Sequence, residues 1–439
     1  GLMHTRSLDD EVTDSAAGAT AFATGVRVNN RVIALDCPKC PNMAESAPLD
    51  TALELMQRVG GRTGFVTTTM LPHATPAAFT AHDNDRDHYR SIGNDQLQLR
   101  PNLMFGGGGI TREQGQRAGY FVLSNKSQLA SLDEHAHDHV MGTFMECSIA
   151  NVDDITACHL PYVFDGYVGD NQDKPQLTDM VPVALREIDR DERRGFFLLI
   201  EGGNIDQAAH AYNYPDHSKR FEKEVAETIV FEQAVDQVLD WLKAREDTLV
   251  IVTADHETGG LILDENHGKG QYPTAHYTTH SHTGVDVGIW AWGAGSQTLQ
   301  DLLEQGEGRI NNTDVFTLLT LPLQHPDNQK QNPDEIPLPS LEAIIDSSDD
   351  DGSDLPVGVV VGVLAGSAAL VCCCAVFAVV LVRHKGPPRQ LSALRRRAGP
   401  VFQPALDRPR KLPFRKKKYA RVGEDRDTSG DIEMAADPE

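Results

Sequence analysis

Four short segments of this 439-residue chain combine polar side chains that could bind an anion or a metal. In the first, residues 13–21, Asp14 and Ser15 are followed by small residues with a high helix tendency. A helix beginning here would place the Ser15 hydroxyl at its N-terminus, where free amides and the helix dipole favour an incoming anion. Taken alone, a serine that only caps the helix is the commoner explanation.

The second segment, residues 201–210, directly follows an apolar run at 196–200. Asp206 and His210 are four residues apart, so a helix would present both on one face as metal ligands. The two glycines after Glu201 would let this carboxylate and the backbone approach a metal closely. The segment therefore predicts metal ligands after a buried strand.

The third and fourth segments lie farther along the chain. Asp255 and His256 come after an apolar run at 249–253, and His282 lies just before another run at 287–292. A single Asp–His pair is more often a structural pair than a site. Three sets near successive strand ends, each offering oxygen and imidazole ligands, predict a metal centre.

Two further histidines, His276 and His280, share the loop with His282. We prefer His282 as the ligand because a Thr-Gly pair and a strand follow it. His280 is the alternative, and His267 is interpreted as a loop residue.

The elements that must position these segments form an α/β pattern. Short apolar strands alternate with helical periodicity, which predicts one domain over residues 1–325 with a central, mostly parallel sheet flanked by helices. The clearest helix spans 220–244, where apolar residues recur with helical spacing. A glycine run at 106–109 lacks the ending of a nucleotide-binding loop and predicts a tight turn. The clearest strands are Gly64–Thr69, Phe196–Ile200, Leu249–Thr253 and Val287–Trp292.

Together, the segments resemble the motifs of the alkaline phosphatase family. Residues 14–25 are similar to its nucleophile signature, and 201–210, 253–256 and 282–284 are similar to its metal-ligand segments, in the same order. A fifth match runs from His73 to His82, with Arg86 downstream. The resemblance covers residue 1 to about residue 321. It implies an alkaline-phosphatase-like fold, a homodimer, and hydrolysis of phosphate monoesters through a phosphoserine at two zinc ions and one magnesium ion.

The resemblance also implies a role for each matching residue. Ser15 would be the catalytic nucleophile that becomes phosphorylated, and Arg86 would bind two phosphate oxygens through its planar fork. Asp14 and His73 would lie beside the metals without binding them directly. The metal ligands would be Asp206, His210 and His282 for the first zinc, Asp255, His256 and Ser15 for the second zinc, and Glu201 and Thr75 for magnesium.

The charge of the chain is compatible with this role. The sequence has 40 Lys and Arg against 64 Asp and Glu, and the residues before Leu355 carry a net charge of −31. So acidic a surface argues against a general nucleic-acid binder, which neutralises phosphates with Lys and Arg. Three divalent cations and Arg86 would reverse the sign of the local field and admit a phosphate monoester.

One residue of the family pattern has no match. The family's first strand carries an Asp that bridges the second zinc and the magnesium, a few dozen residues before the serine, but only 14 residues precede Ser15. Asp9 and Asp10 lack that context and are expected in a surface loop. We therefore expect an export signal, an inner strand and the bridging Asp upstream of Gly1, and weak or no activity from this chain alone.

The C-terminal part has a different composition. Leu355–Val382 is 28 residues without a charge, which predicts one transmembrane helix, since about 20 apolar residues span a bilayer. Acidic residues precede this stretch and Arg383 and Lys385 follow it, so residues 1–354 are expected outside the plasma membrane in a single-pass type I orientation. A glycosylphosphatidylinositol signal is disfavoured because 57 residues follow. Residues 326–354 would be an acidic stalk and 383–439 a basic cytoplasmic tail.

An outside location permits disulfides and glycosylation. For Cys37 and Cys40, a small loop disulfide is favoured over half of a zinc site, because no second pair with suitable spacing accompanies them. Cys147 and Cys158 belong to the same part of the chain, and the disulfide pairing stays open. Asn125 begins a glycosylation sequon, as does Asn311, although such sequons also arise by chance.

Two other functions fit part of the pattern. One is a related metal-dependent phosphodiesterase or sulfatase, but diesterases usually present Thr as the nucleophile, and sulfatases use a modified Cys or Ser within a different signature. The other is a catalytically inactive receptor or adhesion ectodomain. The unmatched Asp and the basic tail support this alternative. The remaining motif residues, which an inactive relative would have little reason to keep, favour the hydrolase.

Overall fold

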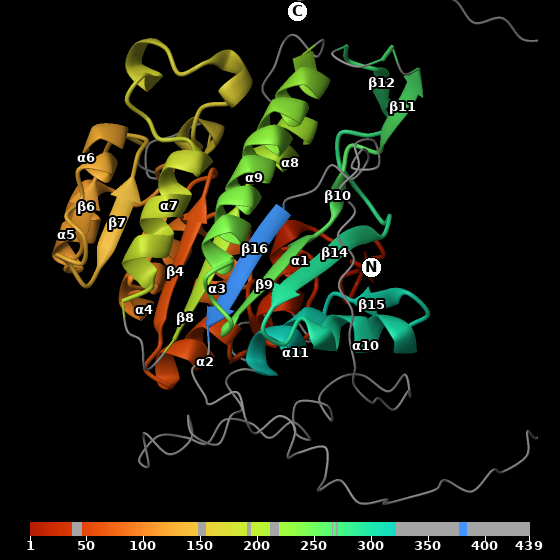
Figure 1. Ribbon diagram of the computed structural model, residues 1–439, viewed down its shortest axis with the longest axis horizontal. Helices are drawn as coiled ribbons and strands as arrows, with labels where there is room; N and C mark the ends of the chain where they lie inside the picture. The colour runs from red at the N-terminus through yellow and green to blue at the C-terminus, as the bar shows by residue number, and fades with distance from the viewer. Residues whose placement is uncertain are drawn as a thin grey trace, which may run out of the picture. The chain divides into compact units, whose positions relative to one another are not determined.

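The computed structural model describes residues 1–36, 46–147, 155–190, 195–210, 219–265, 267–268, 271–321 and 377–383. These residues form a ten-stranded sheet with helices on both faces (Figure 1). In their order across the sheet, the strands are β15 (Arg309–Asn311), β1 (Leu2–His4), β14 (Val287–Gly293), β9 (Thr248–Ala254), β16 (Phe377–Arg383), β8 (Phe196–Glu201), β4 (Arg62–Thr67), β5 (Leu103–Gly106), β7 (Val140–Thr143) and β6 (Phe121–Leu123).

Much of the sheet is parallel, which confirms the predicted α/β class. β4 pairs in parallel with both β8 and β5, and β7 pairs in parallel with β5 and β6. β14 is antiparallel to β9. The four strands predicted from the sequence correspond to β4, β8, β9 and β14, with bounds that differ by at most two residues. Their apolar runs suit strands that are covered on both faces.

Helices cover both faces of the sheet. α7 and α9 pack on each other on the face toward the viewer in Figure 1, and α9 confirms the predicted long helix. On the opposite face, α1 packs against α3 and α11, and α2 packs against α3. The helices are α1 (Ser15–Thr24), α2 (Ala52–Arg58), α3 (Ala74–Thr80), α4 (Tyr89–Leu99), α5 (Arg112–Arg117), α6 (Lys126–Ala130), α7 (Leu177–Ile188), α8 (Asn204–His210), α9 (Arg220–Leu242), α10 (Gln297–Gln305) and α11 (Asp314–Thr320).

Three small two-stranded sheets accompany the main sheet within the described ranges. One joins β10 (Glu257–Thr258) to β13 (His282–Thr283), so it brings together two segments that the sequence marks as metal-binding. The second is the hairpin of β11 (Leu261–Glu265) and β12 (Thr274–Tyr277). The third joins β2 (Leu35–Asp36) to β3 (Ala47–Pro48).

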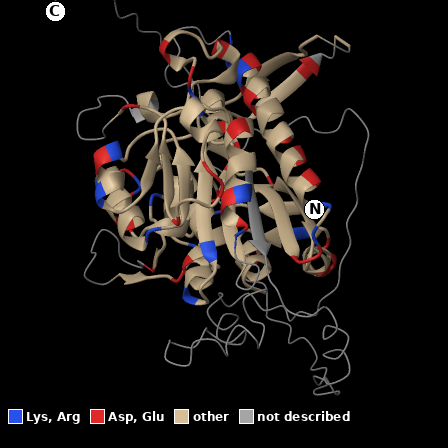
Figure 2. Ribbon diagram, turned by 60° about the vertical axis from the view of Figure 1, so that its left-hand side comes forward, with Lys and Arg blue, Asp and Glu red and all other residues tan. Residues whose placement is uncertain are grey.

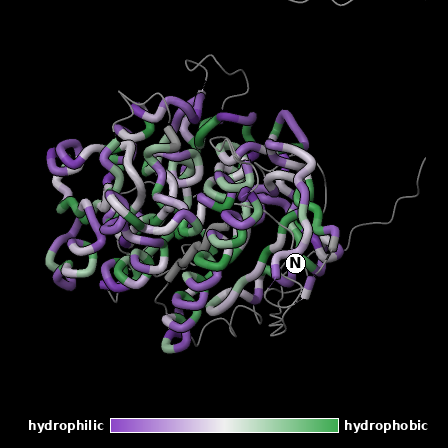
Figure 3. The backbone as a smooth tube through the Cα atoms, turned by 90° about the horizontal axis from the view of Figure 1, so that it is seen from above, coloured by the Kyte–Doolittle hydropathy of each residue, from purple (hydrophilic) through white to green (hydrophobic). Residues whose placement is uncertain are grey.

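The core lies between the sheet and its helices. Phe65, Phe197 and Leu199 are fully buried in the central strands. Lys, Arg, Asp and Glu lie mainly on helices and loops, while the central strands carry few of them (Figure 2). The hydropathy colouring agrees, with hydrophilic turns at the periphery and hydrophobic segments inside (Figure 3). Burial of apolar surface therefore fixes the sheet from which the site is built.

Residues 377–383 correct the prediction for the C-terminal hydrophobic stretch. They form β16, which lies antiparallel between β8 and β9 in the interior of the sheet. The predicted transmembrane helix at 355–382 is therefore wrong for residues 377–382, because an aromatic and β-branched run also suits a buried strand. Residues 355–376 lie outside the described ranges. Among the helices that the structure describes, none has the length and apolar character needed to cross a membrane.

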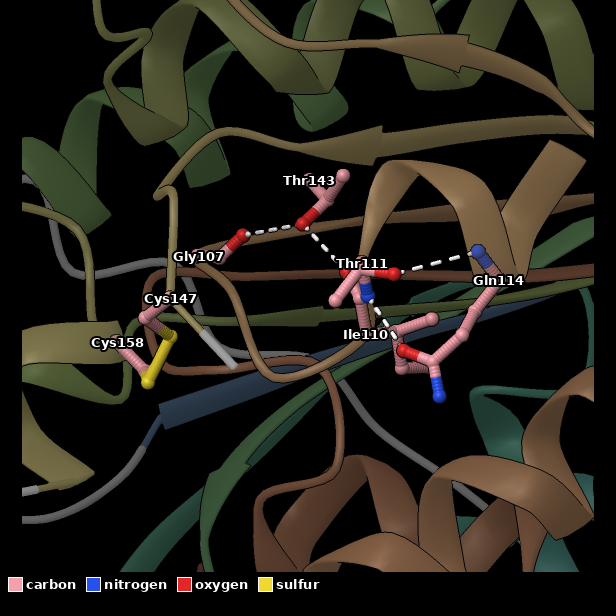
Figure 4. Close-up of a disulfide and its surroundings, with 7 residues drawn as sticks. All are labelled: Gly107, Ile110, Thr111, Gln114, Thr143, Cys147 and Cys158. Carbon is pink, nitrogen blue, oxygen red and sulfur yellow. Dashed lines mark hydrogen bonds between the residues drawn. A yellow bond between two sulfur atoms is a disulfide. The ribbon is translucent and has the colours of Figure 1, made fainter. Parts of the chain in front are cut away.

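A disulfide joins Cys147 to Cys158 (Figure 4). It lies beside the glycine turn that follows β5, where a Cβ on Gly108 would overlap with Sγ of Cys147. The chain bends at 107–108, and Gly109 has a φ of +94°, so the predicted tight turn is present. Cys37 and Cys40 lie outside the described residues.

Candidate active site

The predicted site residues lie near the carboxyl edge of the central strands. Glu201 ends β8 and pairs with Thr67, which ends β4. Asp255 directly follows β9, which runs in the same direction as β8, since both are antiparallel to β16. Strands that run in the same direction end at the same edge, so the sheet brings residues that are far apart in sequence to one place.

Helix α1 places Ser15 at this edge. The helix begins at Ser15, as predicted, and Asp14 caps it by accepting a hydrogen bond from the Ala17 amide at 3.0 Å. All ten residues of the helix are buried. A Cβ on Gly18 would lie 3.1 Å from the carbonyl oxygen of Asp255, so glycine lets α1 pack directly against that residue. The hydroxyl of Ser15 thus comes to the N-terminus of a buried helix.

The Ser15 hydroxyl lies 2.9 Å from Nε2 of His256. Burial lowers the pKa of His256 well below its ordinary value, and the neighbouring His282 lowers it further. The His256 imidazole is therefore neutral, with a lone pair available to a hydroxyl or a metal. The side chains of Ser15 and His256 share one buried position, although 241 residues separate them.

Asp206, His210 and His282 form the first group of potential ligands. Oδ1 of Asp206 lies 3.2 Å from Nε2 of His210 and 3.5 Å from Nε2 of His282, and the two nitrogens are 3.0 Å apart. Ligand atoms at about 2.0–2.1 Å from a tetrahedral zinc are about 3.3 Å from one another. The three atoms therefore have a spacing that fits zinc. Ligand atoms of Asp206, His256 and His282 also lie within 4.8 Å of one another.

Backbone carbonyls orient the two imidazoles. Nδ1 of His210 lies 2.7 Å from the His280 carbonyl oxygen, and Nδ1 of His282 lies 2.9 Å from the Thr13 carbonyl oxygen. A carbonyl only accepts, so each Nδ1 carries a proton and each Nε2 is the ring nitrogen that faces Asp206. Burial lowers the pKa of His210, but Asp206 outweighs burial and raises it. This position therefore attracts positive charge.

Asp255 is a buried carboxylate that lacks compensation. Neither of its side-chain oxygens has a hydrogen-bond partner among the described residues, and Oδ2 lies 3.3 Å from Nε2 of His256. Burial raises the pKa of Asp255 well above its ordinary value, and the carboxylates of Asp206 and Glu201 raise it further. A buried carboxylate without donors is costly unless a cation or proton neutralises it. Asp255 and His256 thus fit a second metal position.

Glu201 and Thr75 form an oxygen-rich group next to it. The Thr67 hydroxyl donates to Oε2 of Glu201, while Oε1 of Glu201 and the Thr75 hydroxyl are buried without a hydrogen-bond partner among the described residues. Burial raises the pKa of Glu201 to about 7, although the Thr67 hydroxyl that donates to it lowers it. Uncompensated oxygen donors of this kind suit a hard cation such as Mg²⁺.

His73 lies at the N-terminus of α3, two residues before Thr75. Burial lowers its pKa well below the ordinary value, and Arg86 lowers it further. Its ring packs edge-on against His159, with 5.5 Å between the ring centroids. The side chain is therefore a neutral neighbour of Thr75.

Arg86 is held next to the serine by Asp14. Its Nη1 lies 3.0 Å from Oδ2 of Asp14, and its backbone amide donates to the Arg31 carbonyl oxygen. Burial lowers the pKa of Arg86, but Asp14 outweighs burial and raises it. Asp14 thus links the helix cap to the guanidinium, and the planar fork of Arg86 lies at the serine end of α1.

Comparison with known proteins identifies the family of the chain. The family model described as alkaline phosphatase matches residues 1–103 and 102–274, which is more than half of the chain. The chain belongs to the alkaline phosphatase family. Alkaline phosphatase 3 of Bacillus subtilis is 32% identical over 270 residues, which cover 58% of this chain and 51% of that protein. Streptomycin-6-phosphate phosphatase of Streptomyces griseus is 30% identical over 379 residues, which cover 71% of this chain and 78% of that protein.

Solved alkaline phosphatase structures share the fold. The enzyme of the Antarctic bacterium TAB5 has a TM-score of 0.58 at 24% identity, over 73% of this chain and 87% of that chain. A cold-active alkaline phosphatase of Shewanella sp. has a TM-score of 0.59 at 25% identity, over 74% of this chain and 90% of that chain. The chain spans about half the length of several curated alkaline phosphatases that it matches.

The side chains at the other predicted positions are not among the potential ligands. His276 pairs with Asp264 on the exposed hairpin of β11 and β12, at 2.8 Å. His280 contributes its backbone carbonyl to His210. Of the two sequon residues, Asn125 caps α6 and Asn311 accepts a hydrogen bond from Arg27.

Three residues that contact the candidate site residues were not predicted from the sequence. The Thr258 hydroxyl contacts Asp206 and His256, Thr67 contacts Glu201, and His159 packs against His73. Thr258 lies two residues after His256 and Thr67 lies inside a predicted strand. A lone threonine at either position carries no signal of its own.

Proposed function

We propose that this chain is the catalytic part of a phosphate-monoester hydrolase in which Ser15 is the nucleophile. The main support is the position of the Ser15 hydroxyl, which lies at the start of a buried helix and 2.9 Å from Nε2 of His256. Next to it lie carboxylate and imidazole atoms with a spacing that could hold a metal. Membership of the alkaline phosphatase family supports the same chemistry. Relatives named phosphatases include one that bears the name of a phosphate monoester, streptomycin 6-phosphate.

Two zinc ions and one magnesium ion belong to this proposal. Bound zinc would supply positive charge that favours the alkoxide of Ser15 and stabilises the transferring phosphoryl group. The unpartnered buried oxygens of Asp255, Glu201 and Thr75 support cation binding. The proposed ligands are Asp206, His210 and His282 for one zinc, Asp255, His256 and Ser15 for the other, and Glu201 and Thr75 for magnesium.

The proposed reaction has two displacements at phosphorus, and different side chains act as the nucleophile and as the phosphate-binding group. Ser15 attacks phosphorus in line with the leaving alcohol, which gives phosphoserine and frees the alcohol. Water then attacks the phosphoserine from the opposite side, so the configuration at phosphorus is retained over the two displacements. Arg86, oriented by Asp14, presents a planar fork to two phosphate oxygens. The amides at the start of α1 add further donors for the phosphate.

The experiment is hydrolysis of p-nitrophenyl phosphate by wild type and Ser15→Ala, each with and without a metal chelator. We expect Ser15→Ala to lower the rate by on the order of 10³-fold or more, while zinc stays bound at the position of Asp206, His210 and His282, which does not include Ser15. Ser7→Ala is the matched control, because Ser7 is also buried but bonds only to Asp9 and Asp10 in the described contacts. Equal rates for wild type and Ser15→Ala would refute the proposal. Absence of both zinc binding and hydrolysis would favour the inactive receptor, and a preference for diesters would favour the phosphodiesterase.

A further inference from the structure

Thr258 lies between the two proposed zinc positions. It is fully buried in β10, and its backbone pairs with that of His282 in β13. The short β10–β13 sheet begins two residues after Asp255. Thr258 therefore contacts the segments that supply ligands to both positions.

The hydroxyl of Thr258 makes two contacts, one to each ligand group. Oγ1 lies 2.6 Å from Oδ1 of Asp206 and 3.3 Å from Nδ1 of His256. The carboxylate of Asp206 only accepts, so the single hydroxyl proton is donated to it. Oγ1 therefore accepts from Nδ1–H of His256.

This direction of donation fixes both neighbours. Because Nδ1 of His256 carries the proton, Nε2 presents its lone pair to the position shared with Ser15 and Asp255. Because Oδ1 of Asp206 is held by Thr258, the carboxylate keeps its orientation toward His210 and His282. Hydrogen-bond partners behind metal ligands commonly fix ring orientation and tautomer in this way.

We propose that Thr258 is a positioning residue that couples the two zinc positions, so that ordering of Asp206 at one position orders His256 at the other. This inference rests on the proposed two-zinc function. Two nearby threonines, Thr253 in β9 and Thr283 in β13, do not make these contacts. The Thr253 hydroxyl donates to the Gly288 carbonyl oxygen and the Thr283 hydroxyl donates to Glu257, so neither contact reaches a proposed ligand.

The test compares zinc binding by the full chain and its Thr258→Val and Thr258→Ser variants, in a titration against a chromophoric chelator. Valine keeps the shape of threonine without the hydroxyl, whereas serine keeps the hydroxyl. Loss of a group behind the ligands typically lowers metal affinity about 10–100-fold. We expect Thr258→Val to lose affinity by this factor at both positions and to lose the dependence of the second binding step on the first. We expect Thr258→Ser to restore both.

Thr253→Val is the matched control, since it removes a buried hydroxyl from β9 that contacts no proposed ligand. We expect it to bind zinc as wild type does. If Thr258→Val does not fold, Thr258→Ala gives the same comparison without the added methyl group. Wild-type affinity at both positions in Thr258→Val, or a loss at one position only, would overturn the coupling while leaving the proposed function intact. A wild-type chain that binds no zinc would overturn both.

Discussion

At the scale of single residues, two buried aspartates have pKa values shifted in opposite directions by their different neighbours. Burial would raise the pKa of Asp206, but His210 and His282 outweigh it and hold the pKa well below the ordinary value. Asp255 lies next to the neutral His256, and burial together with the carboxylates of Asp206 and Glu201 raises its pKa well above the ordinary value. Nearby carboxylates with divergent pKa values are typical of catalytic sites. Binding of a cation would displace the proton that Asp255 otherwise holds, so metal uptake by this site is expected to release protons.

Glu227 lies outside the site, so it can be used to test how burial alone shifts the pKa of a carboxyl group and the stability of the fold. Burial raises its pKa to about 8 from 4.5, partly offset by the Val163 amide that donates to it. The folded state binds this proton more tightly than the unfolded state does, so the stabilisation is present at low pH and is lost as pH rises from about 4.5 to about 8. We expect Glu227→Gln to remove that loss, which amounts to a few kcal/mol at most, at about 1.4 kcal/mol per pKa unit.

Urea unfolding between pH 5 and pH 9 measures this effect. Between pH 5 and pH 9 the free energy of unfolding should fall more for wild type than for the Glu227→Gln variant. Glu222→Gln on the same helix is the control and should keep the wild-type pH dependence. Parallel curves for wild type and Glu227→Gln would show that Glu227 does not titrate as described.

At the scale of elements, the site depends on how closely α1 approaches the end of β9. Gly18 faces Asp255, where a Cβ would lie 3.1 Å from the carbonyl oxygen and 3.2 Å from Cβ. Neither atom belongs to the end of a flexible side chain, so α1 must shift by a few tenths of an ångström to admit a methyl group. Such a shift would move Ser15 relative to His256.

We therefore expect Gly18→Ala to lower the rate of phosphate-monoester hydrolysis by about 10-fold, since small displacements of reacting groups are costly. Its effect on stability should be small, because alanine gains about 1 kcal/mol of helix propensity against the strain. Gly93→Ala in α4 is the control, because its Cβ would meet only the Ile110 side chain at 3.3 Å. Steady-state rates and thermal unfolding of both variants check this. An unchanged rate in Gly18→Ala would show that the close packing has no role in positioning Ser15.

The elements also show where sequence reasoning succeeds and where it fails. β4, β8, β9 and β14 were predictable because each is a short apolar run bounded by polar or glycine residues. The apolar run that contains β16 satisfies the same criterion and also that of a membrane helix, so composition alone does not separate the two states. Thr258 was missed for another reason, because its role arises from a contact with Asp206, 52 residues away in the chain.

At the scale of the whole molecule, the C-terminal hydrophobic stretch cannot both cross a membrane and supply strand β16 to the sheet. If Leu355–Val382 crossed a membrane with residues 1–354 outside, residues 377–382 would lie within or beyond the bilayer and β16 could not form in the same molecule. Residues 355–376 on their own have 22 residues without a charge, and about 20 are enough to span the hydrocarbon layer. Such a span would also place residues 377–383 across the membrane from β8 and β9, so it too excludes β16. We keep the surface tether as a proposal, on the charge asymmetry around this stretch.

The tether predicts a specific protease result with the full chain expressed in cells. Protease added outside should cleave the catalytic part and leave an epitope at the C-terminus protected, and alkaline carbonate should not extract the protein. Permeabilisation with detergent is the control and should expose the epitope. Extraction by carbonate, or cleavage of both parts from outside, would favour β16 over the tether.

The central claim is that side chains scattered over some 270 residues converge around cations next to Ser15. Diffraction data recorded at the zinc absorption edge, from crystals of the zinc-loaded chain, test it most directly. We expect two anomalous peaks, one among Asp206, His210 and His282 and one between Asp255, His256 and the Ser15 hydroxyl. Zinc peaks elsewhere on the molecule, with none at these residues, would contradict it.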